Sequence, residues 1–198
     1  MKSIYIYGAS GHGLVVADIA KACGYTKIIY IDDGTNKHLS FDDIKKENNI
    51  PIAFGIGNNA IRKNLFERVE NYKFTIAILI HPSAVISESV TIGEGTVLMP
   101  NVVINAKSKI GKGVILNTAS LVEHENNIED FVHISPNVSL AGNVKIKECT
   151  HIGINSTAIQ GVIVGKNCII GAGSVIVSNI RDNTLSYGNP CKTIKEIK

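Results

Sequence analysis

The sequence lacks tryptophan, contains few aromatic residues and has no long apolar run. Only 6% of its 198 residues are aromatic, and five are proline. No apolar stretch reaches the roughly 18 residues that a membrane-spanning helix needs, so we expect no membrane span. The start, "MKSIYIYGASGHG", meets glycine directly after a strand-length apolar run and lacks the features of a secretory signal.

Cysteine and net charge are also low. The four cysteines form no C-x-x-C pair and no recognisable metal-ligand spacing, so the sequence predicts no metal site and reduced thiols in a cytoplasmic protein. The formal net charge is only +3, with lysine and arginine scattered along the chain. This pattern gives no support to nucleic-acid binding and suits a phosphorylated small molecule equally well.

Residues 1–79 alternate strand and helix signals. Strands are predicted at "KSIYIYG", "KIIYIDD", "IPIAFGIGN" and "FTIAILI". Helices are predicted at "GLVVADIAKACGY", ended by Gly24, at "SFDDIKKENN", with Ser40 as N-cap, and at "NAIRKNLFERVENY". This order predicts a small Rossmann-like parallel sheet of four strands in an α/β domain.

Residues 80–198 follow a different pattern. Seventeen consecutive hexads run from Ile80 to Arg181, and sixteen of them begin with Ile, Leu or Val. The fifth position of each hexad is usually small or β-branched, and Asn and Gly recur where turns need positive φ. A helix would need apolar residues spaced by three and four, so the six-residue period predicts a parallel β-helix.

The hexads resemble those of the hexapeptide-repeat acyltransferases. The resemblance implies a left-handed β-helix in which three hexads close one coil of 18 residues, and trimers with sites between subunits. On that period His124 stacks with Gly142, and His133 stacks with His151. His124 and His133 are half a coil apart, so they would meet only across two subunits.

His124 stands in the outward third position of its hexad, between Glu123 and Glu125. Most exposed histidines are simply solvated side chains. An adjacent carboxylate can instead fix the tautomer of an imidazole and raise its basicity. His124 is therefore a candidate general base.

The "GASGHG" stretch follows the first predicted strand and matches G-x-x-G-x-G. Backbone N–H groups from Ser10 to Gly13, at a helix N-terminus, suit a phosphate or a sugar hydroxyl. Asp32 and Asp33 end the second strand, where carboxylates commonly meet ribose or base groups. A plain turn capped by two acids is the alternative. NAD is disfavoured because G-x-G-x-x-G is absent.

A closer resemblance covers nearly the whole chain. "YIYGASGHGLV", "IDD", "IGNNAIRK", "VVINAKSKIGKGVILNTASLVEHE" and "AGNVKI" are similar to the bacterial UDP-4-amino-sugar N-acetyltransferases of the bacillosamine pathway, within the sialic-acid O-acetyltransferase-like group. The resemblance implies acetyl transfer from acetyl-CoA to the 4-amino group of a UDP-2-acetamido-4-amino-2,4,6-trideoxy sugar. Transfer would be direct, with no metal and no cysteine nucleophile.

The resemblance also implies roles for individual residues. His124 would be the base and Glu125 would orient it, while His133 from a neighbouring subunit and the Gly142 N–H would hold the acetyl group. The implied sugar-nucleotide set is Ser10, Gly11, His12, Gly13, Asp32, Asp33, Gly57, Asn58, Arg62 and Asn117. The implied CoA set is Ile154, Gly171, Gly173, Pro190 and Lys192, the last two in the tail "GNPCK", where Cys191 replaces the usual alanine.

Other functions stay open. The enzyme alternatives are O-acetylation of a sialic acid and N-acetylation of a GDP- or dTDP-linked amino sugar. The non-enzyme alternative is a trimeric β-helix scaffold or a sugar-nucleotide binding module. A zinc hydratase using His124, His133 and His151 is disfavoured, because only two of these residues lie 18 apart and no zinc signature follows.

Overall fold

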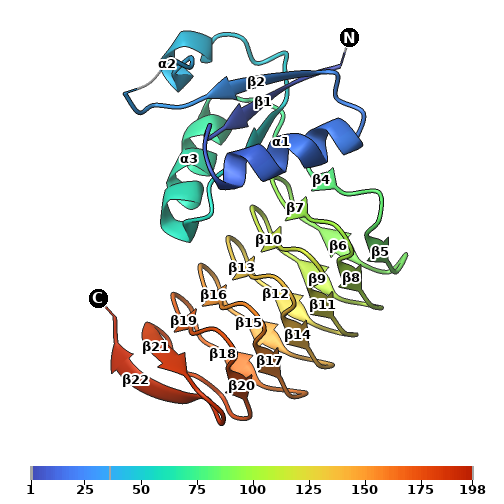
Figure 1. The fold of residues 1–198 in the computed structure, drawn as a ribbon, viewed down its shortest axis with the longest axis vertical. Coiled ribbons are helices and arrows are strands. Elements are labelled where there is room, and N and C mark those ends of the chain that lie inside the picture. Colours follow the sequence, from blue (N-terminus) through green and yellow to red (C-terminus); the bar gives the residue numbers. More distant parts are fainter. Residues whose placement is uncertain (1, 36, 198) are drawn as a thin grey trace.

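The computed structural model describes residues 2–35 and 37–197. An α/β unit formed by the N-terminal third of the chain sits on one end of a long β-solenoid (Figure 1). The polypeptide then descends coil by coil to a C-terminal hairpin at the opposite end. The expected fold class, a small parallel sheet followed by a parallel β-helix, is confirmed.

The N-terminal sheet contains three parallel strands in the order β2-β1-β3. These are β1 (Ser3–Tyr7), β2 (Lys27–Ile31) and β3 (Ile52–Phe54). The helices are α1 (His12–Ala22), α2 (Phe41–Ile44) and α3 (Asn59–Asn71). Gly24, with φ +84°, follows α1 as expected, and Ser40 caps α2 in a capping box with Asp43.

The predicted fourth strand, "FTIAILI", was wrong as a member of this sheet. Only Ile76 pairs with β3, through an isolated bridge to Ile52. The chain then turns away, and β4 (Leu79–Ile80) pairs with β7 (Val97–Leu98) in the solenoid. The apolar segment therefore connects the two sheets. It pairs with β3 at Ile76 and with β7 at Leu79 and Ile80.

Three parallel sheets form the walls of the solenoid, and pairing neighbours lie 18 residues apart. In the first sheet β4 and β7 are followed by β10 (Ile115–Leu116), β13 (His133–Ile134), β16 (His151–Ile152) and β19 (Ile169–Ile170). The second sheet contains β5 (Val85–Ile86), β8 (Val103–Ile104), β11 (Leu121–Val122), β14 (Ser139–Leu140), β17 (Thr157–Ala158) and β20 (Val175–Ile176). The third contains β6 (Thr91–Ile92), β9 (Lys109–Ile110), β12 (Asn127–Ile128), β15 (Lys145–Ile146) and β18 (Ile163–Val164).

The core of the solenoid is built from the first and fifth hexad positions, as the period predicts. First-position residues from Leu98 to Ile176 are buried, and so are fifth-position residues such as Val102, Val132 and Cys168. The fourth position takes the left-handed conformation in coil after coil, and this set includes Asn101, Lys107, Gly113, Ala119, Glu125, Phe131, Asn137, Asn143, Cys149 and Asn155. Asparagine and glycine recur there because they adopt positive φ at low cost.

The C-terminal tail forms a hairpin that the sequence did not predict. Strand β21 (Thr184–Tyr187) joins the first solenoid sheet beside β19 and pairs antiparallel with β22 (Lys192–Glu196). Cys191 is only 4% exposed, which agrees with a small buried residue at this place. The division at residues 79 and 80, with a CoA-binding tail, stays a prediction.

Candidate active site

His124 and Glu125 lie in the turn that joins β11 to β12, at the corner between the second and third solenoid sheets. The His124 side chain is 60% exposed, and its Nδ1 lies 3.1 Å from Glu125 Oε2. Glu125 adopts φ 60°, the left-handed conformation of every fourth position nearby, and this places its side chain beside the ring. This contact fits the tautomer in which Nδ1–H donates a hydrogen bond to Glu125 Oε2 and Nε2 keeps its lone pair.

Gly142 lies directly against the His124 ring, one coil further along, as the 18-residue spacing predicts. A Cβ atom at Gly142 would stand 2.5 Å from His124 Cε1 and 2.6 Å from Nε2. Among the described residues, no backbone hydrogen bond uses the Gly142 N–H. Glycine at this position therefore admits the imidazole and leaves a donor beside its reactive nitrogen.

A row of histidines lies where the α/β unit packs on the first solenoid sheet. His133 and His151 stack with ring centroids 4.6 Å apart, and His12 lies 6.1 Å from His133. His133 Nδ1 is 3.3 Å from the Gly57 carbonyl oxygen, and its Nε2 is 3.3 Å from Asn117 Nδ2. These partners fit a neutral ring that donates from Nδ1 and accepts at Nε2.

Burial keeps these histidines neutral. It lowers the pKa of His133 to about 3, with the nearby His151, Arg62 and His12 adding to the effect. Burial and the Arg62 charge likewise lower the pKa of His12 to about 4 and reduce the pKa of His151. His133 is 8% exposed and already engaged within its own chain, so its part in holding an acetyl group stays a prediction.

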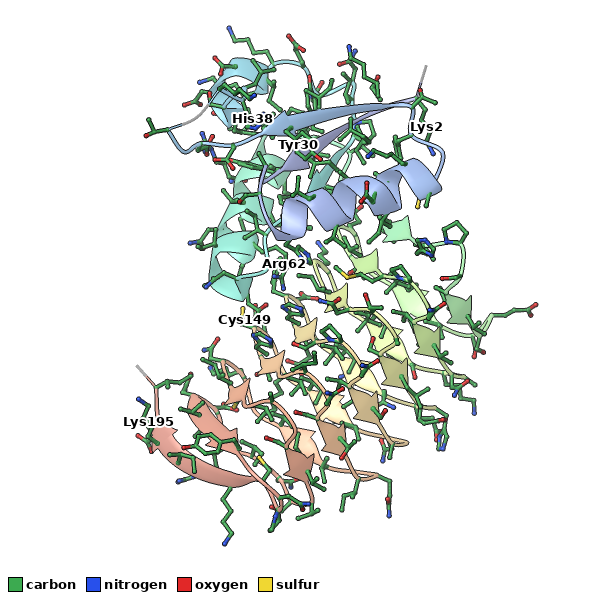
Figure 2. All side chains as sticks on the ribbon, viewed as in Figure 1. Lys2, Tyr30, His38, Arg62, Cys149 and Lys195 are labelled. Carbon is green, nitrogen blue, oxygen red and sulfur yellow. The ribbon has the colours of Figure 1, made fainter. Side chains whose placement is uncertain are left out.

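Arg62 corrects an expectation from the sequence. The guanidinium is 1% exposed, and its nitrogens donate to Ile56 O, Gly57 O, Asn59 Oδ1, Gly113 O and Phe131 O at 2.7 to 3.2 Å. No donor is left for a sugar nucleotide. Figure 2 shows Arg62 between the α/β unit and the solenoid, and we assign it to the junction of the two.

The glycine-rich loop after β1 leads into α1. Gly11 is the N-cap with φ 44°, no acidic residue occupies the first turn, and a Cβ at Gly11 would meet open space. Within the described chain, no backbone bond uses the N–H groups of Ser10, Gly11 or His12. The Gly13 N–H instead donates a hydrogen bond to Ser10 O at 2.8 Å, and a Gly13 Cβ would clash with Gly8 O. Gly13 therefore lets α1 pack closely on the loops that follow β1 and β3.

Asp32 and Asp33 border a pocket of about 200 Å³ at the carboxyl ends of the strands, together with Tyr7, Gly8, Gly34, Ile56, Ile61 and Leu65. This is the switch point between β1 and β3, where open α/β sheets bind ligands. Asp32 accepts from the Ala9 and Gly34 N–H groups at 3.1 and 2.9 Å. Both acids therefore shape the pocket by holding its loops.

Asp33 is bonded on both oxygens. It accepts from the Phe41 N–H at 2.9 Å, from Arg68 at 2.7 Å and from the Tyr7 hydroxyl. Burial alone would raise the pKa of Asp33, but these hydrogen bonds and the Arg68 charge outweigh it and lower that pKa. Burial and the same carboxylate raise the pKa of Tyr7. Asp33 is thus a fixed anion at the pocket wall.

A second pocket, of about 240 Å³, lies between the α/β unit and the solenoid. Its lining includes Gly57, Asn58, His151, Cys168 and Ile169. The Asn58 side chain caps α3 by accepting from the Ile61 N–H at 3.0 Å. Cys149 is a left-handed turn residue, and its carbonyl accepts from Asn59 Nδ2 at 2.9 Å. Asn59 was not identified from the sequence.

The residues expected at CoA lie at the C-terminal end of the solenoid. Ile154 is 44% exposed, and its carbonyl accepts from the Gly173 N–H at 2.8 Å. A Cβ at Gly171 would stand 2.7 Å from Tyr187 Cβ, so this glycine lets the hairpin pack closely. Pro190 and Lys192 are exposed in the hairpin. Contact of these residues with CoA stays a prediction.

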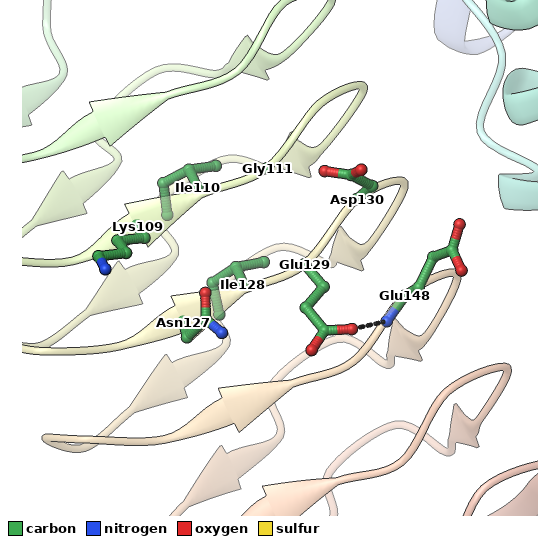
Figure 3. A pocket seen from close by; sticks show the side chains of 8 residues that line it. All are labelled: Lys109, Ile110, Gly111, Asn127, Ile128, Glu129, Asp130 and Glu148. Carbon is green, nitrogen blue, oxygen red and sulfur yellow. Dashed lines mark hydrogen bonds between the residues drawn. The ribbon is translucent and has the colours of Figure 1, made fainter.

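A hollow of about 410 Å³ lies on the third solenoid sheet and contains none of the expected residues. Figure 3 shows Lys109, Asn127, Glu129 and Glu148 around it, with Glu129 accepting the Glu148 N–H. Within residues 2–35 and 37–197, no group of three or more His, Cys, Asp or Glu side chains could hold a metal ion. Over the same residues, no helix has the length and apolar character to cross a membrane.

One chain presents its two candidate regions at different corners. The α/β unit contacts the turns at Gly113 and Phe131, which join the third sheet to the first. His124 and Gly142 occupy turns that join the second sheet to the third. The pocket beside Asp32 and the His124 imidazole therefore belong to different corners of a three-sided prism.

Comparison with known proteins identifies relatives of this chain. Residues 3–69 match the model of the PglD N-terminal domain. UDP-N-acetylbacillosamine N-acetyltransferase of Bacillus subtilis is 35% identical over 114 residues, which are 50% of this chain and 52% of that protein. A putative acetyltransferase of Staphylococcus aureus matches over 68 residues at 35% identity, 34% of each chain. These matches thus span about half or less of the curated relatives.

Two solved structures match over nearly the full length. The acetyltransferase domain of PglB from Neisseria gonorrhoeae is 38% identical, with a TM-score of 0.91 and coverage of 98% of this chain and 100% of that one. A histidine-to-alanine variant of GDP-perosamine N-acetyltransferase from Caulobacter crescentus, bound to CoA and GDP-perosamine, is 32% identical. Its TM-score is 0.94, and the match covers 98% of this chain and 97% of that one. The protein therefore belongs to the two-domain hexapeptide-repeat family of sugar N-acetyltransferases that these structures represent.

Proposed function

We propose that this protein transfers the acetyl group of acetyl-CoA to the 4-amino group of a UDP-2-acetamido-4-amino-2,4,6-trideoxy sugar. The observation that carries the proposal is the exposed His124 imidazole, which Glu125 orients and which lies against Gly142. The Bacillus relative, named for UDP-N-acetylbacillosamine, supports this acceptor. The Neisseria domain, also solved with acetyl coenzyme A, supports the donor.

The chemistry follows from the positions of two groups. His124 Nε2 accepts a proton from the 4-amino nitrogen as that nitrogen attacks the thioester carbonyl carbon. The Gly142 N–H stabilises the developing oxyanion. The C–N bond forms, the C–S bond breaks, and the CoA sulfur leaves with the proton that His124 held. Glu125 stabilises the imidazolium between these two steps.

The acceptor is bound by the α/β unit in this proposal. The N–H groups of Ser10, Gly11 and His12 at the start of α1 suit the diphosphate, because a helix N-terminus favours negative charge. The pocket of about 200 Å³ beside Asp32 suits the nucleoside. CoA would lie along the glycine-containing coils toward the C-terminal hairpin.

We further propose that each complete site forms between two subunits of a homotrimer. His124 and the Asp32 pocket occupy different corners of one prism, so a second copy of the chain is needed to bring them together. Outward residues of the second sheet, including Val85 at 65% exposure, offer an apolar face for such packing.

A GDP-linked 4-amino sugar is the second candidate acceptor. The observation that favours it is the near-complete structural match to the Caulobacter enzyme bound to GDP-perosamine. The two candidates share the amine chemistry and differ only in the nucleotide and the sugar.

Thiol release from acetyl-CoA tests the proposal. The acceptors are UDP-2-acetamido-4-amino-2,4,6-trideoxyglucose, GDP-perosamine and sialic acid, each assayed with the wild type and with His124→Ala. Release with the UDP sugar that falls at least 100-fold in the variant is the expected result. Release only with GDP-perosamine would replace the acceptor, and release with none would favour a scaffold.

A further inference from the structure

Asn126 breaks the pattern of the solenoid corners. The fifth positions of the other sixteen hexads carry Val, Ser, Thr, Ala, Cys or Ile, and only this one carries an amide. Asn126 is 1% exposed and follows Glu125 directly, in the same turn as His124. An amide at this corner therefore lies beneath the candidate general base.

The Asn126 amide nitrogen is bonded to two neighbouring coils. Nδ2 donates to Glu123 O at 2.6 Å and lies 3.4 Å from His124 O, within its own turn. It also donates to Ala141 O at 2.9 Å, in the turn one coil further along. Glu123 directly precedes His124, and Ala141 directly precedes Gly142. One amide thus holds together the two turns that bring the imidazole against the glycine.

Polar residues at the fifth position of other hexads make only part of this hydrogen-bond arrangement. Thr96, Thr150 and Ser156 each donate to the carbonyl 15 residues ahead, at Gly111, Gly165 and Gly171. Asn126 repeats that bond to Ala141 and adds the bonds to its own turn. Ser108 supports the same turn from the preceding coil, donating to Glu123 O at 2.7 Å.

Packing alone does not account for an amide here. Asn126 Oδ1 is buried without a hydrogen-bond partner among the described residues, and such an atom costs about 1–3 kcal/mol. The next coil places Val144, fully buried, at the equivalent corner 18 residues on. A valine would fill the Asn126 corner without an unpaired oxygen, so the amide is retained at a cost in stability.

We propose that Asn126 is a positioning residue that fixes the His124 turn relative to Gly142. The inference rests on the proposed function, in which His124 is the base. Asn126 touches neither substrate, and it acts through the backbone of Glu123, His124 and Ala141. A displacement of about 1 Å in such a turn is enough to cost on the order of 100-fold in rate.

Three variants test the proposal. Asn126→Val keeps the packing and removes the bonds, Asn126→Ser restores a single corner donor, and Thr96→Val removes a corner hydroxyl far from His124. The expected kcat of Asn126→Val is about 10- to 100-fold below wild type, with both KM values within about threefold. Asn126→Ser should recover part of the loss, and Thr96→Val should keep wild-type kcat.

Thermal unfolding and crystal structures separate positioning from stability and from the proposed function. Asn126→Val is expected to unfold at or above the wild-type temperature, with its His124 ring moved off Gly142. An unchanged ring, or a kcat equal to wild type, would overturn the positioning proposal. If the wild type acetylates no acceptor, the proposed function fails, and the ring position in the crystals still decides whether Asn126 holds the turn.

Discussion

At the scale of single residues, Gly142 is where the candidate site depends most directly on a missing side chain. Its φ is not in the left-handed region, so glycine is required here only because the His124 ring lies where a Cβ atom would stand. Glu125 shows the converse case, because its left-handed φ follows from the solenoid turn and its side chain then serves the imidazole. Backbone geometry and site chemistry are thus coupled within two adjacent turns.

Gly142→Ala should lower kcat by at least about 100-fold while leaving the fold intact. The added methyl would overlap the His124 ring, which must rotate away from the oxyanion position. The measurement is acetyl transfer beside a circular dichroism melt. Asn143→Ala, one residue away, provides a matched control for general damage to the turn, and equal losses in the two variants would contradict the steric explanation.

Glu125→Gln should lower kcat by about 10- to 100-fold. The amide keeps a hydrogen bond to His124 Nδ1 but removes the charge that stabilises the imidazolium. Steady-state kinetics with both substrates varied would show the change in kcat with little change in KM. A wild-type kcat in this variant would mean that the carboxylate charge plays no part.

At the scale of elements, the fourth hexad position takes the left-handed conformation in every turn from Gly95 to Gly173, whatever residue stands there. Lys107 (φ 61°), Ala119 (φ 56°) and Phe131 (φ 57°) adopt it although they lack the asparagine or glycine that favours it. The stacked coils impose this conformation, and the hydrogen bonds between coils offset the backbone strain at these positions.

Lys107→Gly should raise the free energy of unfolding by about 0.5–1 kcal/mol, because glycine removes the left-handed strain at φ 61°. Lys109→Gly, two residues later in β9, should lower it by a similar amount, because that position is extended. Urea denaturation of the two variants is the measurement. The same sign of change in both would contradict the argument.

At the scale of the whole molecule, the junction of the α/β unit with the solenoid is built from groups that must stay neutral or fully bonded. Arg62 is buried there with six protein oxygens around it, and burial lowers its pKa to about 10. His12, His133 and His151 lie beside it. Protonating a histidine here adds a second buried positive charge, so the junction is expected to weaken in acid.

Stability should therefore depend on pH. The folded pKa of His133 is about 3 and that of His12 about 4, below the unfolded value of 6.5. Their contribution is full above pH 6.5 and is lost as pH falls toward the folded values, by up to about 1.4 kcal/mol per pH unit for each histidine. Urea denaturation from pH 7.5 to 4.5 should show this slope, and His133→Asn should flatten it. An equal slope in both proteins would contradict the assignment.

Mixed assemblies test the proposed sharing of sites. His124→Ala lacks the base, and Gly11→Asp puts a carboxylate at the proposed diphosphate site, so each variant alone should be inactive. Co-refolded subunits should regain about a quarter of wild-type activity, because random mixing restores one complete site in four. Mixtures that stay inactive would place the base and the acceptor site within one chain.

The sequence by itself determined the solenoid, because its period fixes which residue of every hexad faces the core, and it placed His124 over Gly142 through their 18-residue spacing. It also placed the capped helices of the α/β unit. Only the tertiary structure decided that Arg62 belongs to the junction, that "FTIAILI" divides between two sheets, and that the tail forms a hairpin. Those outcomes depend on contacts between segments far apart in the chain, whereas the period and the caps depend on neighbours along it.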